Sequence, residues 1–262
     1  MPQFGDVSVE VNEDRVALVE VQRPPHNFFS PAMLESVADA LDAVDADPEA
    51  RCVVLTGQGK NFCAGAELAE KNPKLTSEVD DGVERPHIYD YAVRMFGATT
   101  PIVAAVNGAA VGGGLGLACM ADFRIGGPGT RMTANFARLG FHHGFGLSVT
   151  LPAIVGQQRA LELLYTGKRI KGDEAAELGL LDRFVPDDEV RATAMELATE
   201  IARSAPLAVT SIKETMRGHL PQAIRSATDR ERAEQERLRE TADWKEGVAA
   251  MAQRRLPDFE GR

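Results

Sequence analysis

The chain has 262 residues, of which 44% are hydrophobic and 26% charged, a balance typical of a globular protein of one or two domains. Its formal net charge of −10 disfavours a general electrostatic affinity for nucleic acids or anionic membranes. No apolar run approaches a membrane span, and the N-terminal residues lack a signal-peptide pattern, so we expect a cytoplasmic protein without membrane insertion.

The first 186 residues alternate predicted strands and helices. Residues 7–21 alternate with a period of two around a polar break, which predicts a strand pair. Ser30 and Pro31 form an N-cap and first-turn pair that opens an amphipathic helix. Further short strands are predicted at 51–57, 100–108, 123–127 and 181–186. The polar segment 68–86 has little periodicity, so we expect it to be mobile.

The C-terminal part of the chain has a different character. Helical patterns ending at glycines cover 155–167 and 171–180, and from residue 187 onward the pattern is almost entirely helical. We therefore predict an α/β layered fold with a core at 1–200 and a helical region at 201–262. The cysteines Cys52, Cys63 and Cys119 are widely spaced in apolar sequence, which favours buried thiols over disulfides or a metal site.

Two clusters of very small residues each precede a predicted helix. Three consecutive glycines occupy 112–114, and the run Ala64, Gly65 and Ala66 lies earlier in the chain. The first N–H groups of a helix have no partner within it and favour negative charge. Two such N–H groups that converge on one oxygen form an oxyanion hole, which stabilises the charge that develops on a thioester carbonyl.

These motifs resemble the enoyl-CoA hydratase/isomerase, or crotonase, superfamily. "NFCAGAEL" and "PIVAAVNGAAVGGGLGLACMADFRI" are similar to its two oxyanion motifs, and "GQQRALELLYTGKRIKGDEAAELGLLDRFVP" to its downstream helical signature. "DWKEGVAAMAQRRLPDF" resembles its C-terminal ending. The resemblance implies a spiral of ββα repeats, a helical C-terminal region that forms a homotrimer or a dimer of trimers, and a coenzyme A thioester as substrate with no separate cofactor.

The same resemblance assigns roles to individual residues. It implies that the backbone N–H groups of Ala66 and Gly113 form the oxyanion hole. Lys60 would lie near the CoA nucleotide, and Arg254 would reach a CoA phosphate across subunits, unless it is an ordinary surface arginine. The substrate contacts predicted in this way come from Lys60, Ala64, Gly65, Gly112, Gly116, Phe136 and Arg254.

The chain departs from the hydratases of the family at both catalytic glutamates. The aligned positions carry Gly116 and Phe136, so neither supplies a carboxylate. Hydration by a shared acid and base, which contributes about 10²- to 10⁴-fold, is therefore doubtful. We expect Gly116 to leave space where a catalytic side chain would stand, and Phe136 to border an apolar acyl pocket.

Other residues could carry the proton instead. His142 and His143 lie in a glycine-rich segment that borders the acyl pocket in the family, although packing or a subunit contact explains two adjacent histidines equally well. Tyr89 aligns approximately with a water-activating histidine of the family's dehalogenases. The aspartate nucleophile of those enzymes is replaced here by Gly144, which makes dehalogenation an unfavourable interpretation.

Three functions follow from these residues. The leading one is an acyl-CoA enzyme, a lyase or isomerase, that stabilises a thioester enolate and uses a non-standard acid/base group. The second is a noncatalytic acyl-CoA-binding homologue, suggested by the missing glutamates. The third is a CoA-independent β-diketone hydrolase with a histidine base.

Overall fold

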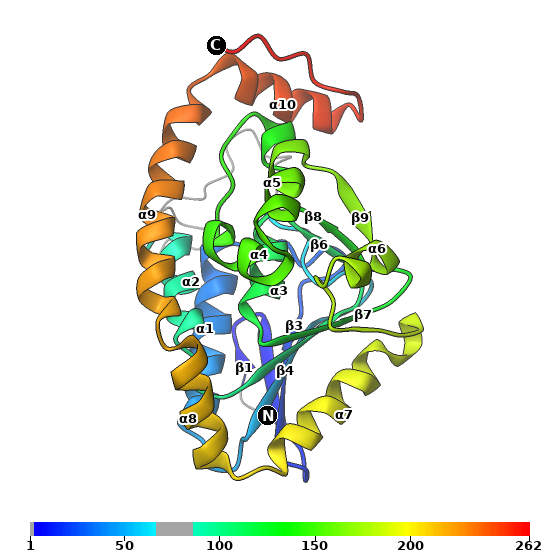
Figure 1. Cartoon of the computed structure of the whole chain (residues 1–262), viewed down its shortest axis with the longest axis vertical. Coiled ribbons are helices and arrows are strands. Elements are labelled where there is room, and N and C mark those ends of the chain that lie inside the picture. Colours follow the sequence, from blue (N-terminus) through cyan, green and yellow to red (C-terminus); the bar gives the residue numbers. More distant parts are fainter. Residues whose placement is uncertain (1–2, 67–85) are drawn as a thin grey trace.

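The computed structural model of the chain describes residues 3–66 and 86–262 (Figure 1). The segment predicted to be mobile, 68–86, lies outside these residues apart from its last residue. The predicted α/β organisation is confirmed, with strands concentrated in the first part of the chain and helices in the last.

A seven-stranded sheet forms the centre of the fold, in the order β1-β2-β3-β4-β5-β7-β10. Its strands are β1 (Gln3–Phe4), β2 (Val7–Val11), β3 (Val16–Val21), β4 (Cys52–Gly57), β5 (Ile102–Val106), β7 (Phe123–Gly126) and β10 (Arg183–Phe184). The first three strands pair antiparallel and the remaining neighbours pair parallel. The predicted strand pair at 7–21 is therefore confirmed as β2 and β3.

A second, three-stranded sheet was not predicted from the sequence. It consists of β6 (Ala109–Val111), β8 (Arg131–Thr133) and β9 (Arg169–Lys171) in the order β6-β8-β9. Strands of three residues are too short to show a period of two, which explains why the pattern missed them. An isolated parallel bridge joins Cys63 to Ala110, and this bridge brings the first small-residue motif beside β6.

Ten α-helices are present among the described residues. They are α1 (Pro31–Asp45), α2 (Ile88–Phe96), α3 (Gly113–Met120), α4 (Leu147–Val155), α5 (Gln157–Thr166), α6 (Gly172–Glu177), α7 (Val190–Ala202), α8 (Pro206–Arg217), α9 (Leu220–Arg239) and α10 (Ala242–Ala252). The predicted N-cap of α1 is confirmed, because the Ser30 side chain accepts a hydrogen bond from the backbone N–H of Met33.

Helices cover both faces of the large sheet. Along β4, Val53 and Leu55 belong to the core cluster shared with α1, whereas Cys52 and Val54 belong to the cluster shared with α7. Since successive side chains of a strand point to opposite faces, α1 and α7 pack on opposite sides of the sheet. Figure 1 shows α7 diverging from the sheet on the side away from α1 and α2.

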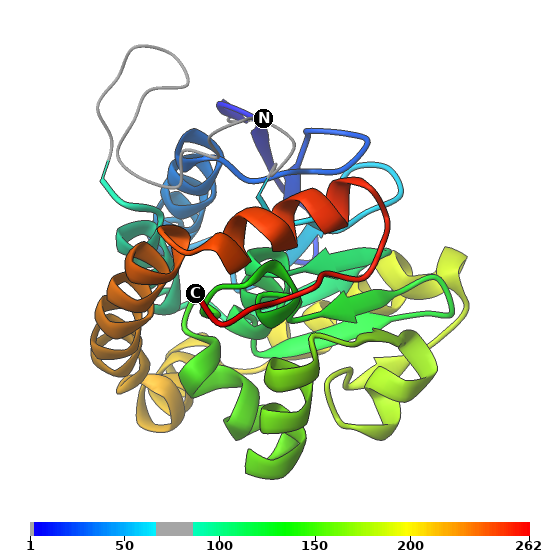
Figure 2. The same cartoon turned by 90° about the horizontal axis from the view of Figure 1, so that it is seen from above.

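The C-terminal helices α8 and α9 run along one side of the molecule, and α10 lies across its end (Figure 1). Helix α9 packs along α2 and also against α4. Helix α10 packs on residues 137–139 and, seen from above, crosses over the middle of the molecule (Figure 2). In the part of the chain that the structure describes, no helix is both long and apolar enough to cross a bilayer.

Candidate active site

A cavity of about 600 Å³ lies where the two small-residue motifs, α2, α9 and α10 meet. Most of its wall is aromatic, aliphatic or bare backbone. Its larger apolar side chains are Phe28, Phe29, Ile88, Val111, Phe136, Leu139, Phe141, Phe145 and Met251, and its polar ones are His26, Asn61, Tyr89, Asn135, Arg169, Gln235 and Arg254. No aspartate or glutamate lines it among residues 3–66 and 86–262.

The backbone wall is formed by residues 64–66 and 112–114, all of which line the cavity except Gly114. Ala66 and Gly113 both line the cavity. A side-chain carbon added to Gly65 would lie 2.6 Å from the Val111 carbonyl oxygen and 4.0 Å from the Gly113 nitrogen, so the two motifs touch. Gly113 is the first residue of α3, and its N–H therefore has no acceptor within the helix.

Glycines in the backbone wall are required by close packing. The amide of Gly112, which has a φ of +56°, donates to the Thr133 carbonyl at 2.9 Å. A side chain on Gly113 would collide with the Phe29 ring, and one on Gly114 with the Cys63 carbonyl oxygen. The small residues thus let two backbone segments and one aromatic ring meet at the N-terminus of α3.

The space expected beside Gly116 is not open, which corrects that prediction. A carbon added to Gly116 would lie 2.6 Å from Cβ and 2.7 Å from Cδ1 of Phe145. The Phe145 side chain is buried and lies 6.2 Å from the Phe29 ring, measured between ring centroids. Gly116 does not line the cavity, because Phe145 fills the position that a longer side chain at 116 would occupy.

Another part of the cavity surface, the side-chain wall, consists of Tyr89, Gly144 and Gln235. The Tyr89 hydroxyl donates a hydrogen bond to Oε1 of Gln235 at 2.8 Å, and Nε2 of Gln235 donates to the His142 carbonyl at 2.9 Å. A side chain on Gly144 would collide with the Tyr89 hydroxyl oxygen. An aspartate at 144 therefore cannot coexist with Tyr89 in this position.

His142 and His143 lie behind this wall and do not line the cavity. Their rings stack with centroids 4.1 Å apart, and Nδ1 of His142 lies 2.8 Å from the carbonyl oxygen of His143. Nε2 of His143 lies 2.8 Å from the Ser148 hydroxyl, which donates to Glu231 at 2.6 Å. The predicted histidine pair therefore belongs to a hydrogen-bonded network that anchors residues 142–148 to α9.

Burial sets the protonation states of these groups. Desolvation raises the pKa of Tyr89, and the negative charge of Glu231 raises it further. Desolvation also lowers the pKa of His143 to about 4, with a smaller contribution from His142. Tyr89 and His143 are consequently both neutral near pH 7.

Glu231 is the buried carboxylate of the network. Its oxygens accept hydrogen bonds from the backbone N–H of Gly146 at 2.9 Å and of Ser148 at 3.1 Å, in addition to the Ser148 hydroxyl. Desolvation raises its pKa, while these hydrogen bonds act in the opposite direction. Glu231 holds the turn before α4 and is not part of the cavity surface.

The remaining predicted contacts divide into two groups. Phe136 and Arg254 line the cavity, as do Ala64, Gly65 and Gly112. Arg254 follows α10 and lines the cavity of its own chain, and its predicted contact with a CoA phosphate across subunits stays a prediction. Lys60 is exposed and does not line the cavity, although its neighbour Asn61 does.

Gln235 and Phe145 were not predicted from the sequence as cavity residues. Gln235 lies within the charged stretch of α9, but it continues the buried series Ile224, Thr228 and Glu231 at helical spacing. An uncharged residue at this spacing, within a highly charged helix, was the sequence signal that Gln235 is buried. Phe145 has a φ of +61°, and only the three-dimensional structure shows that its side chain lies against Gly116.

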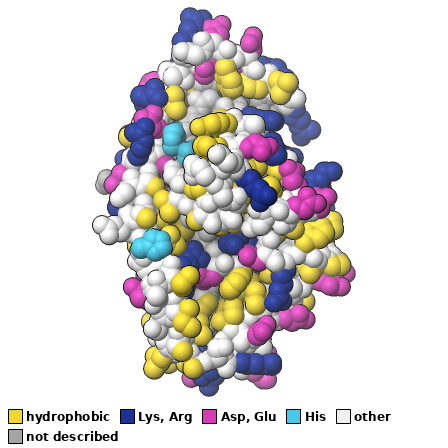
Figure 3. All heavy atoms as spheres, in the orientation of Figure 1, with side chains coloured by type: hydrophobic (Ala, Val, Ile, Leu, Met, Phe, Trp, Pro, Cys, Tyr) yellow, Lys and Arg dark blue, Asp and Glu magenta, His cyan; other side chains and the backbone are white. Residues whose placement is uncertain are grey.

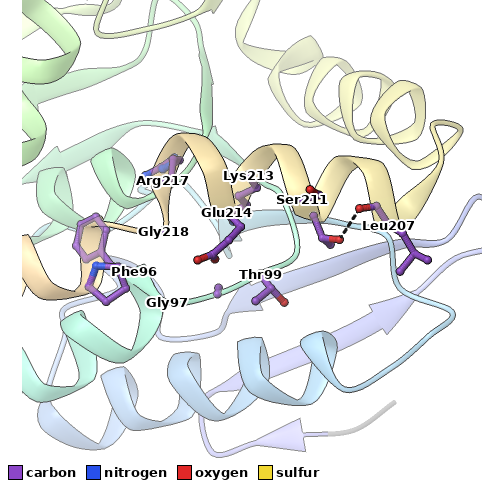
Figure 4. A pocket seen from close by; sticks show the side chains of 12 residues that line it. Phe96, Gly97, Thr99, Leu207, Ser211, Lys213, Glu214, Arg217 and Gly218 are labelled. Carbon is purple, nitrogen blue, oxygen red and sulfur yellow. Dashed lines mark hydrogen bonds between the residues drawn. The ribbon is translucent and has the colours of Figure 1, made fainter.

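A second hollow, of about 310 Å³, lies between the end of α2 and α8. Figure 4 shows Lys213, Glu214 and Arg217 on α8 facing the segment that contains Phe96, Gly97 and Thr99. Both cations are paired with Asp122, Lys213 at 3.1 Å and Arg217 at 2.5 Å. This hollow is therefore bordered by an ion-paired joint that fastens α8 to the sheet.

Comparisons with known proteins show the family to which the chain belongs. The family model described as enoyl-CoA hydratase/isomerase matches residues 11–262. A putative enoyl-CoA hydratase from Thermus thermophilus is 35% identical over 257 residues, covering 96% of this chain and 100% of that protein. The 1,2-epoxyphenylacetyl-CoA isomerase of Escherichia coli is 31% identical over 253 residues, covering 95% and 97%.

Solved structures show the same likeness. An enoyl-CoA hydratase/isomerase from Pseudoalteromonas atlantica aligns with a TM-score of 0.86 at 29% identity, covering 98% of this chain and 100% of that one. A carnitinyl-CoA hydratase from Mycobacterium avium aligns with a TM-score of 0.85 at 31% identity, covering 98% and 99%. The predicted crotonase-like fold is confirmed, and the chain belongs to the enoyl-CoA hydratase/isomerase family.

Proposed function

We propose that this protein is an acyl-CoA thioester enzyme that stabilises a thioester enolate with the backbone N–H groups of Ala66 and Gly113. The observation that carries the proposal is the meeting of the two small-residue motifs at one cavity, where both residues line the wall. Donors fixed in place before the reaction stabilise developing charge without the cost of reorganising solvent. The N-terminus of α3 adds its partial positive charge.

The acid/base group in this proposal is not a carboxylate, because no aspartate or glutamate lines the cavity among the residues that the structure describes. His142 and His143 are hydrogen-bonded away from the cavity, and Tyr89 is a neutral hydroxyl on it. A substrate that loses its own carboxylate, or one whose enolate takes its proton from bound water, suits such a site. We therefore assign the proton transfer to water held in the cavity rather than to a glutamate pair.

The test is α-carbon deuterium exchange. The purified protein is incubated in deuterated water with crotonyl-CoA and with bulky, aromatic and malonyl-type acyl-CoAs, and mass spectrometry follows deuterium incorporation. Exchange supports the proposal even without net reaction. Binding of these thioesters without exchange or turnover would favour the noncatalytic homologue, for which the carboxylate-free wall is the supporting observation. No binding by calorimetry would overturn the assignment to CoA thioesters.

A variant makes this test specific to the backbone wall. Gly113→Ala places a methyl group against Phe29 and displaces the first N–H of α3, so we expect exchange to fall by about 100-fold or more. Gly97→Ala is the matched control, because its added carbon lies 3.1 Å from the nearest atom and outside this cavity. Circular dichroism verifies that both variants fold.

We also propose that the protein assembles as a homotrimer or a dimer of trimers through its C-terminal helices. Helix α8 exposes Leu207, Ile212 and Met216, with exposed fractions of 85%, 63% and 68%. Hydrophobic side chains gather over α8 and between α8 and α7 on the face seen in Figure 3. Analytical ultracentrifugation tests the assembly, and a monomer at micromolar concentration would contradict it.

A further inference from the structure

The hydrogen bonds between the polar groups of the side-chain wall, the Tyr89 hydroxyl and the Gln235 amide, have a defined direction. Gln235 is buried, with 4% of its surface exposed, and bridges the Tyr89 hydroxyl and the His142 carbonyl. A carbonyl oxygen accepts hydrogen bonds and cannot donate one, so the NH₂ end of the Gln235 amide must face His142. Its oxygen therefore faces Tyr89, and the neighbouring groups fix this orientation chemically.

This orientation commits the hydrogen of the Tyr89 hydroxyl. Because Oε1 of Gln235 only accepts, Tyr89 must be the donor across the 2.8 Å contact. The Tyr89 oxygen then interacts with any further partner as an acceptor. Because Tyr89 lines the cavity, its oxygen can accept a hydrogen bond from a ligand there.

Tyr89 and the two proposed oxyanion donors belong to different parts of the cavity surface. Ala66 and Gly113 belong to the two small-residue motifs, whereas Tyr89 lies on α2, with its hydroxyl oxygen against the bare backbone of Gly144. A substrate group that contacts the Tyr89 oxygen is therefore a different group from the thioester carbonyl at Ala66 and Gly113.

We infer that the Tyr89 oxygen, held as an acceptor by Gln235, is a specificity determinant that binds a distal hydroxyl group of the acyl chain. The inference rests on the proposed CoA thioester function and narrows its substrate class to hydroxylated acyl groups. A hydroxyl in the apolar cavity gains its hydrogen bond here. An acyl chain without a hydroxyl leaves the Tyr89 oxygen without a hydrogen-bond donor. A ketone at the same place brings its oxygen against the Tyr89 oxygen, and two acceptors repel each other.

Calorimetry with a matched ligand series tests this selectivity. The probes are hexanoyl-CoA, its 4-, 5- and 6-hydroxy derivatives, and the 4- and 5-oxo derivatives. We expect one hydroxy isomer to bind about threefold to tenfold more tightly than hexanoyl-CoA, and the oxo compounds to bind more weakly than the hydroxy isomer. In Tyr89→Phe the ratio of hydroxy to unsubstituted affinity should fall to about one.

Gln235→Met provides a second variant with a different expected result. It removes the acceptor that holds the Tyr89 hydrogen while keeping a side chain of similar length, so the hydroxyl can turn and donate to a ligand. The oxo compounds should then gain affinity relative to the hydroxy isomer. A loss of packing alone would weaken all ligands together and leave this ratio unchanged.

Tyr91→Phe is the matched control. Tyr91 lies on the same helix, is also buried and donates to Glu35 at 3.2 Å, but does not line the cavity. Its removal should not change the ligand ratios. If the wild-type protein binds all these thioesters without preferring a hydroxyl, or if Tyr89→Phe retains the preference, the inference is overturned while the proposed function stands. If none of the thioesters binds, both are overturned.

Discussion

The two sides of the cavity are built by different means. The backbone wall is nearly free of side chains, and strand pairing and glycines that permit close contact position its two candidate donors, the N–H groups of Ala66 and Gly113. The side-chain wall presents the hydroxyl of Tyr89 on α2 and the amide of Gln235 on α9. These two residues are 146 positions apart in the sequence. Behind it, Glu231 and Ser148 fix the turn that carries Gly144.

This difference separates a general function from a particular one. Backbone donors offer the same chemistry to any thioester, and their position depends on the absence of side chains rather than on their identity. The side-chain wall can change its hydrogen-bonding character through a single substitution while the sheet and the backbone wall are preserved. We therefore expect reaction type to follow the backbone wall and acyl selectivity to follow the side-chain wall.

The strongest way to break the backbone wall is Gly114→Ala. The added methyl group would collide with the Cys63 carbonyl oxygen, which is fixed by its hydrogen bond from the Val111 amide at 3.0 Å. We expect the free energy of unfolding to fall by about 3 kcal/mol, measured by urea denaturation. Gly97→Ala should cost less than about 1 kcal/mol. Equal stability of the two variants would show that the motifs are not tightly packed.

The side-chain wall is tested by Glu231→Gln. The amide would place an NH₂ group where Glu231 now accepts hydrogen bonds from Gly146 and Ser148, leaving a buried polar group unpaired. We expect a loss of about 2 kcal/mol in unfolding free energy and faster hydrogen exchange in residues 142–148. The exposed Glu236, paired with Arg232 at 2.8 Å, is the control, and Glu236→Gln should cost about 0.5 kcal/mol or less. Indistinguishable losses would contradict an anchoring role for Glu231.

The dependence of stability on pH sharpens the comparison, because the two histidines lie only behind the side-chain wall. The pKa of His143 is about 4 in the folded chain and about 6.5 when unfolded, so between these values the unfolded chain binds the extra proton. Stability should therefore fall as the pH drops through this window, by up to about 1.4 kcal/mol per pH unit from this group. Denaturation curves at pH 7, 5.5 and 4.5 should show a shallower decline in His143→Gln, and parallel declines would refute the assignment.

The smallest expected effect concerns Gly116, where the two walls meet through Phe145. Gly116→Ala crowds Cβ of Phe145 at 2.6 Å but gains about 1 kcal/mol of helix propensity, so we expect a net loss of about 1 kcal/mol. In a Phe145→Ala background the crowding disappears, and the same change should become stabilising. Thermal unfolding of the four proteins measures this coupling. Additive effects would mean that Phe145 does not restrict position 116.

Much of the scaffold could be predicted from local pattern. Short-range periodicity and capping chemistry predict the strand pair at 7–21, the N-cap at Ser30 and the buried strand at 51–57. The structure contains all three, the last as β4 at Cys52–Gly57. Strands β6, β8 and β9 could not be predicted in this way, because each has three residues and is defined by its partners. The spacing of Gln235 from Ile224, Thr228 and Glu231 fits one helix face, but its burial depends on the packing of α9 on α2.

The sequence by itself determined that two motifs each present a nearly bare backbone. Glycine has no side chain and alanine only a methyl group, so runs of these residues before a helix expose the backbone N–H groups. Only the tertiary structure decided that both motifs border one cavity and that Phe145 fills the space beside Gly116. It also decided that Tyr89 donates its hydrogen to Gln235. Contacts between residues so distant in the chain depend on how helices and strands pack, and packing leaves no signature in any local stretch of sequence.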